Sequence, residues 1–325
     1  MPYHSYSDLI KEFKRLEDEH PGEISHEVIG KSANELDIYL FKIGRGRGRV
    51  SFGAAIHGNE RCVGELMLLY ARWLLERKED AARRIFERCY TLICPSENPD
   101  SWGIRRKNAR GVDCNRNFPF HWCECGSSTN PHSPIYKGPN ALSESEARAV
   151  HYIFTRYKPK WHLSLHSGTE VIAFPWCYTY KRPKDYDYFV DTCVKITNLA
   201  KSRGVDPYSY GQVPYLSVPV DLAEKVPVII HGREYIIYCC SGVSIDDSYR
   251  YGIYSMVLEL SHYFEPPYDR LVSYYFPRFL PIAIVLSMES EEVGIPFLFE
   301  TAVVGASFLG ATIGGIAAVR EEFWG

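Results

Sequence analysis

The apolar residues of this chain recur at spacings that predict alternating helices and strands. An amphipathic N-terminal helix is expected, with Ser7 near its cap and one apolar face formed by Leu9, Ile10, Phe13 and Leu16. Strands are predicted at residues 26–32, 36–44, 50–56, 90–95, 161–167 and 254–260. Helical periodicity predicts helices at residues 63–79, 143–157, 185–203 and 268–290. This alternation favours an α/β sandwich, in which ligands bind beyond the ends of strands.

Composition narrows the class of protein. The 325 residues are 46% hydrophobic, so the chain can bury a large core. Lys and Arg number 37 against 40 Asp and Glu, without a long run of one sign, which gives no electrostatic case for binding nucleic acid. The N-terminus lacks the apolar region of a signal peptide, and the ten cysteines do not resemble a secreted disulfide framework. We therefore expect a cytoplasmic protein with mostly reduced thiols.

Five His-x-x-Glu pairs are candidates for part of a metal site, so the spacing alone does not select one. The pair His57/Glu60 directly follows the fully apolar strand 50–56, and His166 ends a second apolar strand. A catalytic zinc takes three ligands from histidine and carboxylate and keeps one position open. Since 166 − 57 = 109, these ligands would be brought together by the fold. In isolation, the alternative for each pair is two polar residues that happen to lie close in sequence.

The long segment 96–140 has little periodicity and is rich in Pro, Gly and Asn, which is typical of functional loops. It carries Asn115 and Arg116, and a guanidinium can bind a carboxylate through two hydrogen bonds. Arg105, Arg106 and Arg110 precede them. A solvated basic loop is the alternative for these arginines. Glu259 ends an apolar strand, where a buried carboxylate is costly unless it has a function.

The chain resembles the zinc carboxypeptidases of the carboxypeptidase A type. The resemblance spans about residues 3–289 and consists of seven motifs in the family's order: HGNE, NPD, RRKN, DCNRNF, SLHS, YCCSGVSID and LEL. It implies a single-domain sandwich with a central mixed, mostly parallel twisted sheet covered by helices on both faces. It also implies a hydrolase that removes C-terminal residues from peptides and binds one Zn²⁺ per chain.

The resemblance assigns roles to individual residues. It makes His57, Glu60 and His166 the zinc ligands, Glu259 the general base and Arg106 the oxyanion stabiliser. The substrate's terminal carboxylate would be bound by Asn115 and Arg116 and covered by Tyr238, with Tyr235 as the rival position for this tyrosine.

The substrate pocket floor matches Ile245, which favours apolar C-terminal residues. An alignment error of one residue would instead place Asp246 or Asp247 there. Two other functions compete: an amidase or deacylase of the same fold acting on a non-peptide or cell-wall amide, and a catalytically silent peptide-binding module. The complete set of ligands, base and NRN motif disfavours both. The sequence does not determine the physiological substrate or the oligomeric state.

A cluster of soft ligands in the long loop has several interpretations. His121, Cys123, Cys125 and His132 lie within twelve residues and could hold a structural zinc, but Cys-x-Cys is not the usual spacing. Free thiols, or a disulfide to Cys177 or Cys193, are the alternatives.

The C-terminal tail lies outside the resemblance. We predict a catalytic domain at residues 1–289 and a hydrophobic, Gly-rich tail at 290–325. Residues 301–319 carry no charge, close to the ~20 apolar residues that span a bilayer, and Gly310 and Gly314 form G-x-x-x-G. A membrane anchor is therefore the alternative to a tail that packs on the domain or on a second subunit. Removal of residues 291–325 is expected to leave a folded, active domain.

Overall fold

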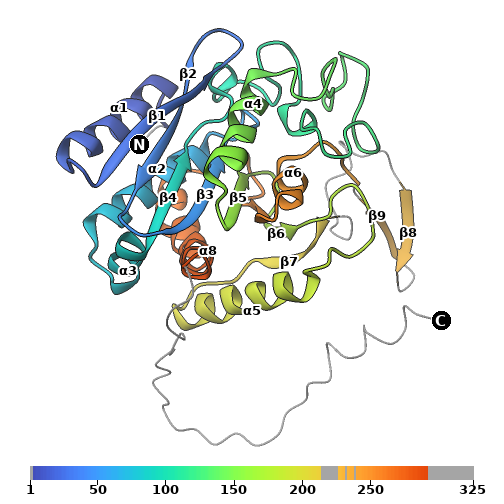
Figure 1. The fold of residues 1–325 in the computed structure, drawn as a ribbon. Coiled ribbons are helices and arrows are strands. Elements are labelled where there is room, and N and C mark those ends of the chain that lie inside the picture. The colour runs from blue at the N-terminus through green and yellow to red at the C-terminus, as the bar shows by residue number, and fades with distance from the viewer. Residues whose placement is uncertain (1–2, 214–225, 231–232, 238, 292–325) are drawn as a thin grey trace, which may run out of the picture. The chain divides into compact units, whose positions relative to one another are not determined.

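Eight strands form one mixed sheet with the order β1-β2-β4-β3-β5-β10-β6-β7 (Figure 1). The computed structural model describes residues 3–213, 226–230, 233–237 and 239–291. Neighbouring strands are parallel in the pairs β4–β3, β3–β5, β5–β10 and β6–β7, and antiparallel in the other three. The strands of this sheet are β1 (Ile24–Lys31), β2 (Asp37–Ile43), β3 (Gly48–Ala54), β4 (Cys89–Cys94), β5 (Trp161–His166), β6 (Val171–Phe174), β7 (Ser209–Gln212) and β10 (Tyr254–Glu259).

Helices cover both faces of the sheet. One layer contains α1 (Tyr6–Glu19), α2 (Cys62–Glu76), α3 (Asp80–Arg88), α5 (Tyr186–Ser202) and α8 (Phe276–Glu289). The other contains α4 (Ser145–Tyr152) and α6 (Ser244–Arg250), which contact each other (Figure 1). The short helix α7 (Tyr268–Arg270) leads through a π-helical turn into α8. The predicted α/β sandwich with a mixed, mostly parallel sheet is confirmed.

Alternation along β2 divides its apolar side chains between two of the core clusters. In β2, Phe41 and Ile43 pack into the cluster that includes α1, α2 and α8, whereas Ile38 and Leu40 pack into the cluster beneath α4. Successive side chains of a strand point to opposite faces, so a strand covered on both sides must be apolar at nearly every position. This explains why the central strands read as continuous apolar runs.

The parallel strands β3, β5 and β10 end at the same edge of the sheet. His166 is the last residue of β5, and Glu259, the last residue of β10, is its partner in the parallel register. β3 ends at Ala54, opposite Leu165, so the chain turns out of the sheet immediately before His57. The sheet thereby brings three segments that are far apart in the sequence together at this edge, as expected for an open α/β sheet.

Several element predictions need correction. The first helix begins at Tyr6, and Ser5 rather than Ser7 caps it by accepting a hydrogen bond from the Asp8 amide. The helix predicted at 63–79 ends at Glu76, where Arg77 adopts a left-handed conformation, and α3 follows as a separate helix. The short strands β6 and β7 were not predicted. Nor was the antiparallel hairpin of β8 (Val226–Ile230) and β9 (Arg233–Ile237).

Among the described residues, one helical segment, Tyr268–Glu289, is long and apolar enough to cross a membrane by length and composition, with a mean hydropathy of 1.5. Its most apolar window is 67% buried inside the domain. It packs against α5, α2 and the sheet, as core helices of globular domains also do. The described residues belong to one compact unit, and the predicted membrane segment 301–319 lies outside them.

Candidate active site

The three predicted zinc ligands lie together at the sheet edge. His57 Nδ1 is 2.8 Å from a carboxylate oxygen of Glu60 and 3.1 Å from His166 Nδ1, and His166 Nδ1 is 3.1 Å from the second Glu60 oxygen. Each of the three residues is at most 4% exposed. Within the described part of the chain, this is the group of three His, Cys, Asp or Glu residues whose ligand atoms converge. Two imidazoles and one carboxylate are a donor set that suits a catalytic zinc.

The opposite ring nitrogen of each histidine also has a partner. His57 Nε2 is 3.3 Å from Asp113 Oδ1, and His166 Nε2 is 3.1 Å from Ser164 Oγ. Such contacts to the outer ring nitrogen orient a metal-binding histidine. Asp113 was not predicted from the sequence. Its place two residues before Asn115, at the start of the same motif, was the available signal.

The electrostatic field of the cluster favours a charged Glu60. Burial alone would raise the pKa of Glu60, but His57 and His166 outweigh it and hold this pKa at about 2. Burial likewise acts to raise the pKa of Asp113, but Arg106, Arg116 and His57 lower it well below its usual value. Two carboxylates therefore stay ionised beside the histidines, which suits a site for a divalent cation.

Glu259 lies at the end of β10, next to His166 in the register. Burial raises its pKa to about 7, against the opposing effect of His166. A carboxylate with a pKa near neutrality can accept a proton from water and later return it. This property matches the general-base role that the resemblance implies.

Arg106 reaches the cluster from the long loop. Its Nε and Nη2 atoms donate to Asp113 Oδ2 at 3.0 and 2.8 Å, and Nη1 lies 3.3 Å from His57 Nδ1. The loop is held by backbone hydrogen bonds of Gly58, whose amide donates to the Arg106 carbonyl oxygen at 3.3 Å. A Cβ atom at Gly58 would lie 2.3 Å from the Ser101 carbonyl oxygen, so this close approach requires glycine.

Asn115 and Arg116 belong to a short 3-10 turn, Cys114–Arg116, in which the Asp113 side chain accepts a hydrogen bond from the Asn115 amide. Asn115 Oδ1 accepts from the Ser244 amide at 3.0 Å, which ties this turn to the start of α6. Arg116 is 2% exposed and donates from Nε to the Gly126 carbonyl oxygen at 2.7 Å. The backbone therefore holds both side chains in place before any substrate binds.

One cavity connects the predicted site residues. Its polar side is formed by His57, Arg106, Asn115, Arg116, His166 and Glu259. Its apolar side is formed by Val171, Ala173, Val213, Val243, Ile245 and Val257. The cluster of candidate ligands is thus open to a space with charged groups at one end and aliphatic side chains at the other.

Neither of the two acids that follow Ile245 lines this cavity. Asp246 accepts hydrogen bonds from the backbone amides of Cys177 at 3.0 Å and Tyr178 at 3.1 Å. Asp247 is paired with His151 at 2.7 Å and with Arg250 at 2.8 Å. Of the three consecutive residues, only Ile245 lines the cavity.

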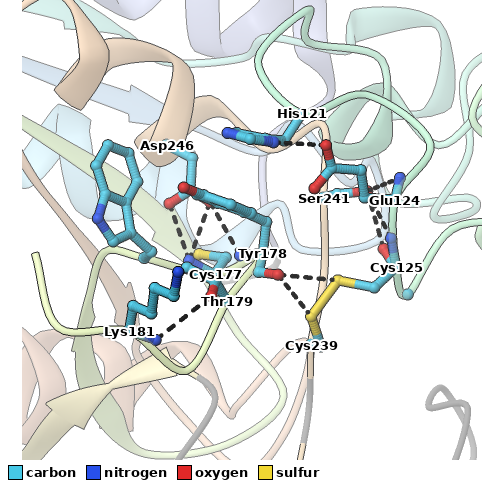
Figure 2. Close-up of a disulfide and its surroundings, with 12 residues drawn as sticks. His121, Glu124, Cys125, Cys177, Tyr178, Thr179, Lys181, Cys239, Ser241 and Asp246 are labelled. Atoms are coloured by element: carbon cyan, nitrogen blue, oxygen red, sulfur yellow. Dashed lines mark hydrogen bonds and ion pairs between the residues drawn. A yellow bond between two sulfur atoms is a disulfide. The ribbon is translucent and has the colours of Figure 1, made fainter.

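The remaining predictions have different outcomes. Tyr238 lies outside the described residues, as does the side chain of its rival Tyr235. Cys125 forms a disulfide with Cys239 (Figure 2). For this cysteine the three interpretations, a free thiol, a zinc ligand and a bond to Cys177 or Cys193, are therefore wrong. Cys123 is a free, exposed thiol, and His121 pairs with Glu124.

The comparisons with known proteins agree with this geometry. The family profile described as zinc carboxypeptidase matches residues 9–275, and the chain therefore belongs to the zinc carboxypeptidase family. It is 28% identical over 286 residues to human carboxypeptidase A6, which covers 79% of this chain and 60% of that protein. It is 26% identical over 292 residues to bovine carboxypeptidase B, which covers 79% and 63%.

Solved structures show the same fold. The bovine thrombin-activatable fibrinolysis inhibitor, in complex with a tick carboxypeptidase inhibitor, superposes with a TM-score of 0.74 at 22% identity, covering 89% of this chain and 97% of that one. Carboxypeptidase A from Helicoverpa armigera gives 0.74 at 20% identity, covering 88% and 74%. The chain spans about 53–62% of the length of the first curated relatives that it matches.

Proposed function

We propose that this protein is a zinc-dependent carboxypeptidase that hydrolyses the C-terminal peptide bond of peptides. The observation that carries the proposal is one cavity lined by His57 and His166 of the ligand cluster, by Glu259, and by the Asn115–Arg116 pair. A peptidase that removes one residue needs these three groups at fixed distances from one another. When bound by the cluster, zinc would supply Lewis-acid activation of water and of the scissile carbonyl.

The chain's own residues have separate tasks in this reaction. Glu259 accepts the proton of the attacking water and passes it to the leaving amine. Arg106, held by Asp113, donates hydrogen bonds to the oxygen that becomes negative in the transition state. Asn115 and Arg116 bind the terminal carboxylate and so set its distance to the scissile bond, while the side chain of the terminal residue enters the apolar end of the cavity.

A direct assay tests the proposal. Blocked dipeptides with a free C-terminal carboxylate should be hydrolysed by the purified protein, and a chelator should stop the reaction until zinc is restored. C-terminally amidated versions of the same peptides serve as the matched control. Equal cleavage of free and amidated peptides would favour an amidase, and absence of cleavage by a zinc-loaded protein would favour a binding module.

Apolar C-terminal residues are the expected substrates because Ile245 lines the cavity and neither of the two following acids does. In a panel that varies only the last residue, we expect higher kcat/KM for aromatic and branched aliphatic residues than for Lys, Arg, Asp or Glu. One missing methylene in an apolar pocket typically changes kcat/KM by about 10-fold or more, so the ranking is measurable. Faster cleavage of C-terminal Lys or Arg would contradict this assignment.

Arg116→Lys tests the proposed binding of the substrate's C-terminal carboxylate. Lysine keeps the charge but loses the planar pair of donors, so kcat/KM for free C-terminal peptides is expected to fall by about tenfold or more. The zinc content should not change, since Arg116 is not among the clustered ligand residues. Arg110→Lys, in the same loop but outside the cavity lining, is the control. An unchanged kcat/KM in Arg116→Lys would place the carboxylate elsewhere.

We further propose that residues 292–325 are dispensable for folding and catalysis. Every assigned site residue precedes this tail, and the cut is placed after Glu291 because its carboxylate pairs with Arg84 at 3.1 Å. The truncated protein should keep its zinc, its melting temperature and its peptidase activity. A truncate that loses zinc or unfolds at a lower temperature would show that the tail belongs to the domain.

Membrane fractionation of the full-length and the truncated protein tests the expected location and the expected membrane anchor. The cytoplasmic location and the anchor at residues 301–319 are alternatives, and they differ in whether the full-length protein sediments with membranes while the truncate does not. The Cys125–Cys239 disulfide is a feature typical of oxidising compartments. Trapping free thiols with an alkylating reagent at lysis would report whether this bond exists in the cell.

A further inference from the structure

Two free cysteines lie next to each other in the wall of the cavity. Cys177 follows β6 and Cys240 precedes α6, and both side chains line the space that Ile245 and Val243 also line. The Cys240 amide donates to the Cys177 carbonyl oxygen at 3.0 Å. Both cysteines also belong to one buried apolar cluster. The proposed catalytic steps use neither thiol.

The backbone on both sides of this pair is anchored. Asp246 accepts from the amides of Cys177 and Tyr178, and the neighbouring Cys239 is bonded to Cys125. Figure 2 shows the Cys177–Tyr178 segment between Asp246 and the disulfide, with the Tyr178 carbonyl oxygen 3.1 Å from Cys239 Sγ. These contacts fix the backbone around both cysteines. A disulfide needs its two cysteines at such a defined separation.

The surroundings make the two thiols unequal. The hydrogen bond from Cys177 lowers the pKa of Cys240, and the nearby Arg116 guanidinium lowers it further, against the effect of burial. Burial raises the pKa of Cys177 well above its usual value. A thiolate is the nucleophile in thiol–disulfide exchange, so Cys240 would react first and Cys177 second.

We propose that Cys177 and Cys240 form an oxidisable thiol pair within the substrate cavity, which reacts with small organic disulfides and closes to a Cys177–Cys240 disulfide. The Cys240 thiolate attacks one sulfur of the reagent, whose S–S bond breaks and releases one thiolate. The Cys177 thiolate then attacks Cys240 Sγ and displaces the second half of the reagent. The protons of the two cysteines pass to the two released thiolates, so the reagent is reduced by the two electrons that the cysteines lose.

Closure of this bond would restrict the apolar end of the cavity. It links the segment after β6 to the segment before α6, and residues of both segments line the cavity that receives the terminal side chain. A wall that cannot widen discriminates against large side chains more than small ones. This consequence rests on the proposed carboxypeptidase function, whereas the formation of the bond does not.

The experiment uses the zinc-loaded, full-length protein and bis(2-hydroxyethyl) disulfide as the probe. After treatment and alkylation of the remaining thiols, peptide mapping should identify a Cys177–Cys240 cross-link with Cys125–Cys239 retained. In the same sample, kcat/KM for a C-terminal Phe substrate should fall by about tenfold relative to a C-terminal Val substrate, and a thiol reductant should restore it. The zinc content should stay constant.

Matched variants separate this site from other thiols. Cys123→Ser removes the exposed free cysteine and should leave both the cross-link and the kinetic response intact. Cys177→Ser and Cys240→Ser, each compared with its own untreated form, should lose both. A map that joins Cys240 to Cys125, or shows both thiols unmodified, would overturn the proposal. A cross-link without any change in the Phe/Val ratio would overturn its role in the cavity, and an inactive protein that still forms the cross-link would count against the proposed function alone.

Discussion

Glu259→Gln is expected to reduce turnover by about 100- to 10,000-fold, which is the contribution typical of a general base. The amide keeps the size of the side chain but cannot accept the proton of the attacking water. Zinc binding should persist because Glu259 is not among the three converging ligand residues. Binding of a slowly cleaved peptide should also persist, so the loss should appear in kcat and not in the dissociation constant.

The matched control is Glu76→Gln, which changes an exposed carboxylate at the end of α2. It should behave like the unmodified protein. If Glu259→Gln kept more than a few per cent of turnover, the base would have to be another residue.

The pH dependence provides a second test of Glu259. Burial raises the pKa of Glu259 to about 7, so the carboxyl group is protonated, and inactive as a base, as the pH falls through that value. We therefore expect kcat/KM to decrease on the acid side of neutrality. The residual activity of Glu259→Gln should lack this acidic limb, because the group that titrates has been removed.

His166→Ala is expected to remove zinc from the purified protein. The substitution deletes one of three ligands and leaves the charge of Glu60 without one of its two histidine partners. Loss of an outer contact to a metal-bound histidine typically weakens binding by 10- to 100-fold, so loss of the ligand itself should exceed about 100-fold. Elemental analysis should find far less than one zinc per chain, and peptidase activity should be lost with it.

His132→Ala is the appropriate control, since this histidine is exposed in the long loop and belonged to the alternative metal cluster. It should retain zinc and activity. Stoichiometric zinc in His166→Ala would contradict the proposed ligand set, and circular dichroism of both variants would establish whether the fold is intact.

The secondary structure was predictable where an element was long and its pattern covered several turns. The apolar stripe of α1, Leu9, Ile10, Phe13 and Leu16, is buried as predicted. β6 and β7 have four residues each, too few to show alternation, and β6 becomes a strand because it pairs with β10 on one side and β7 on the other. α3 was not predicted, although its three buried residues, Ala82, Ile85 and Phe86, follow helical spacing, because a nine-residue helix offers only this one short stripe.

By itself, the sequence determined the residue types of the site and the local spacing of His57 and Glu60, because a three-residue separation after a strand brings two side chains into one turn. It also determined the family, through motifs whose order the fold requires.

Only the tertiary structure decided which distant residues meet. His166 lies beside His57 because β5 pairs with β3 in parallel. Cys125 forms its disulfide with Cys239, which is 114 residues away in the sequence. It also decided that Ile245 faces the cavity and Asp246 does not. These choices depend on packing between elements far apart in the chain, and local pattern carries no information about the loop closures that bring them together.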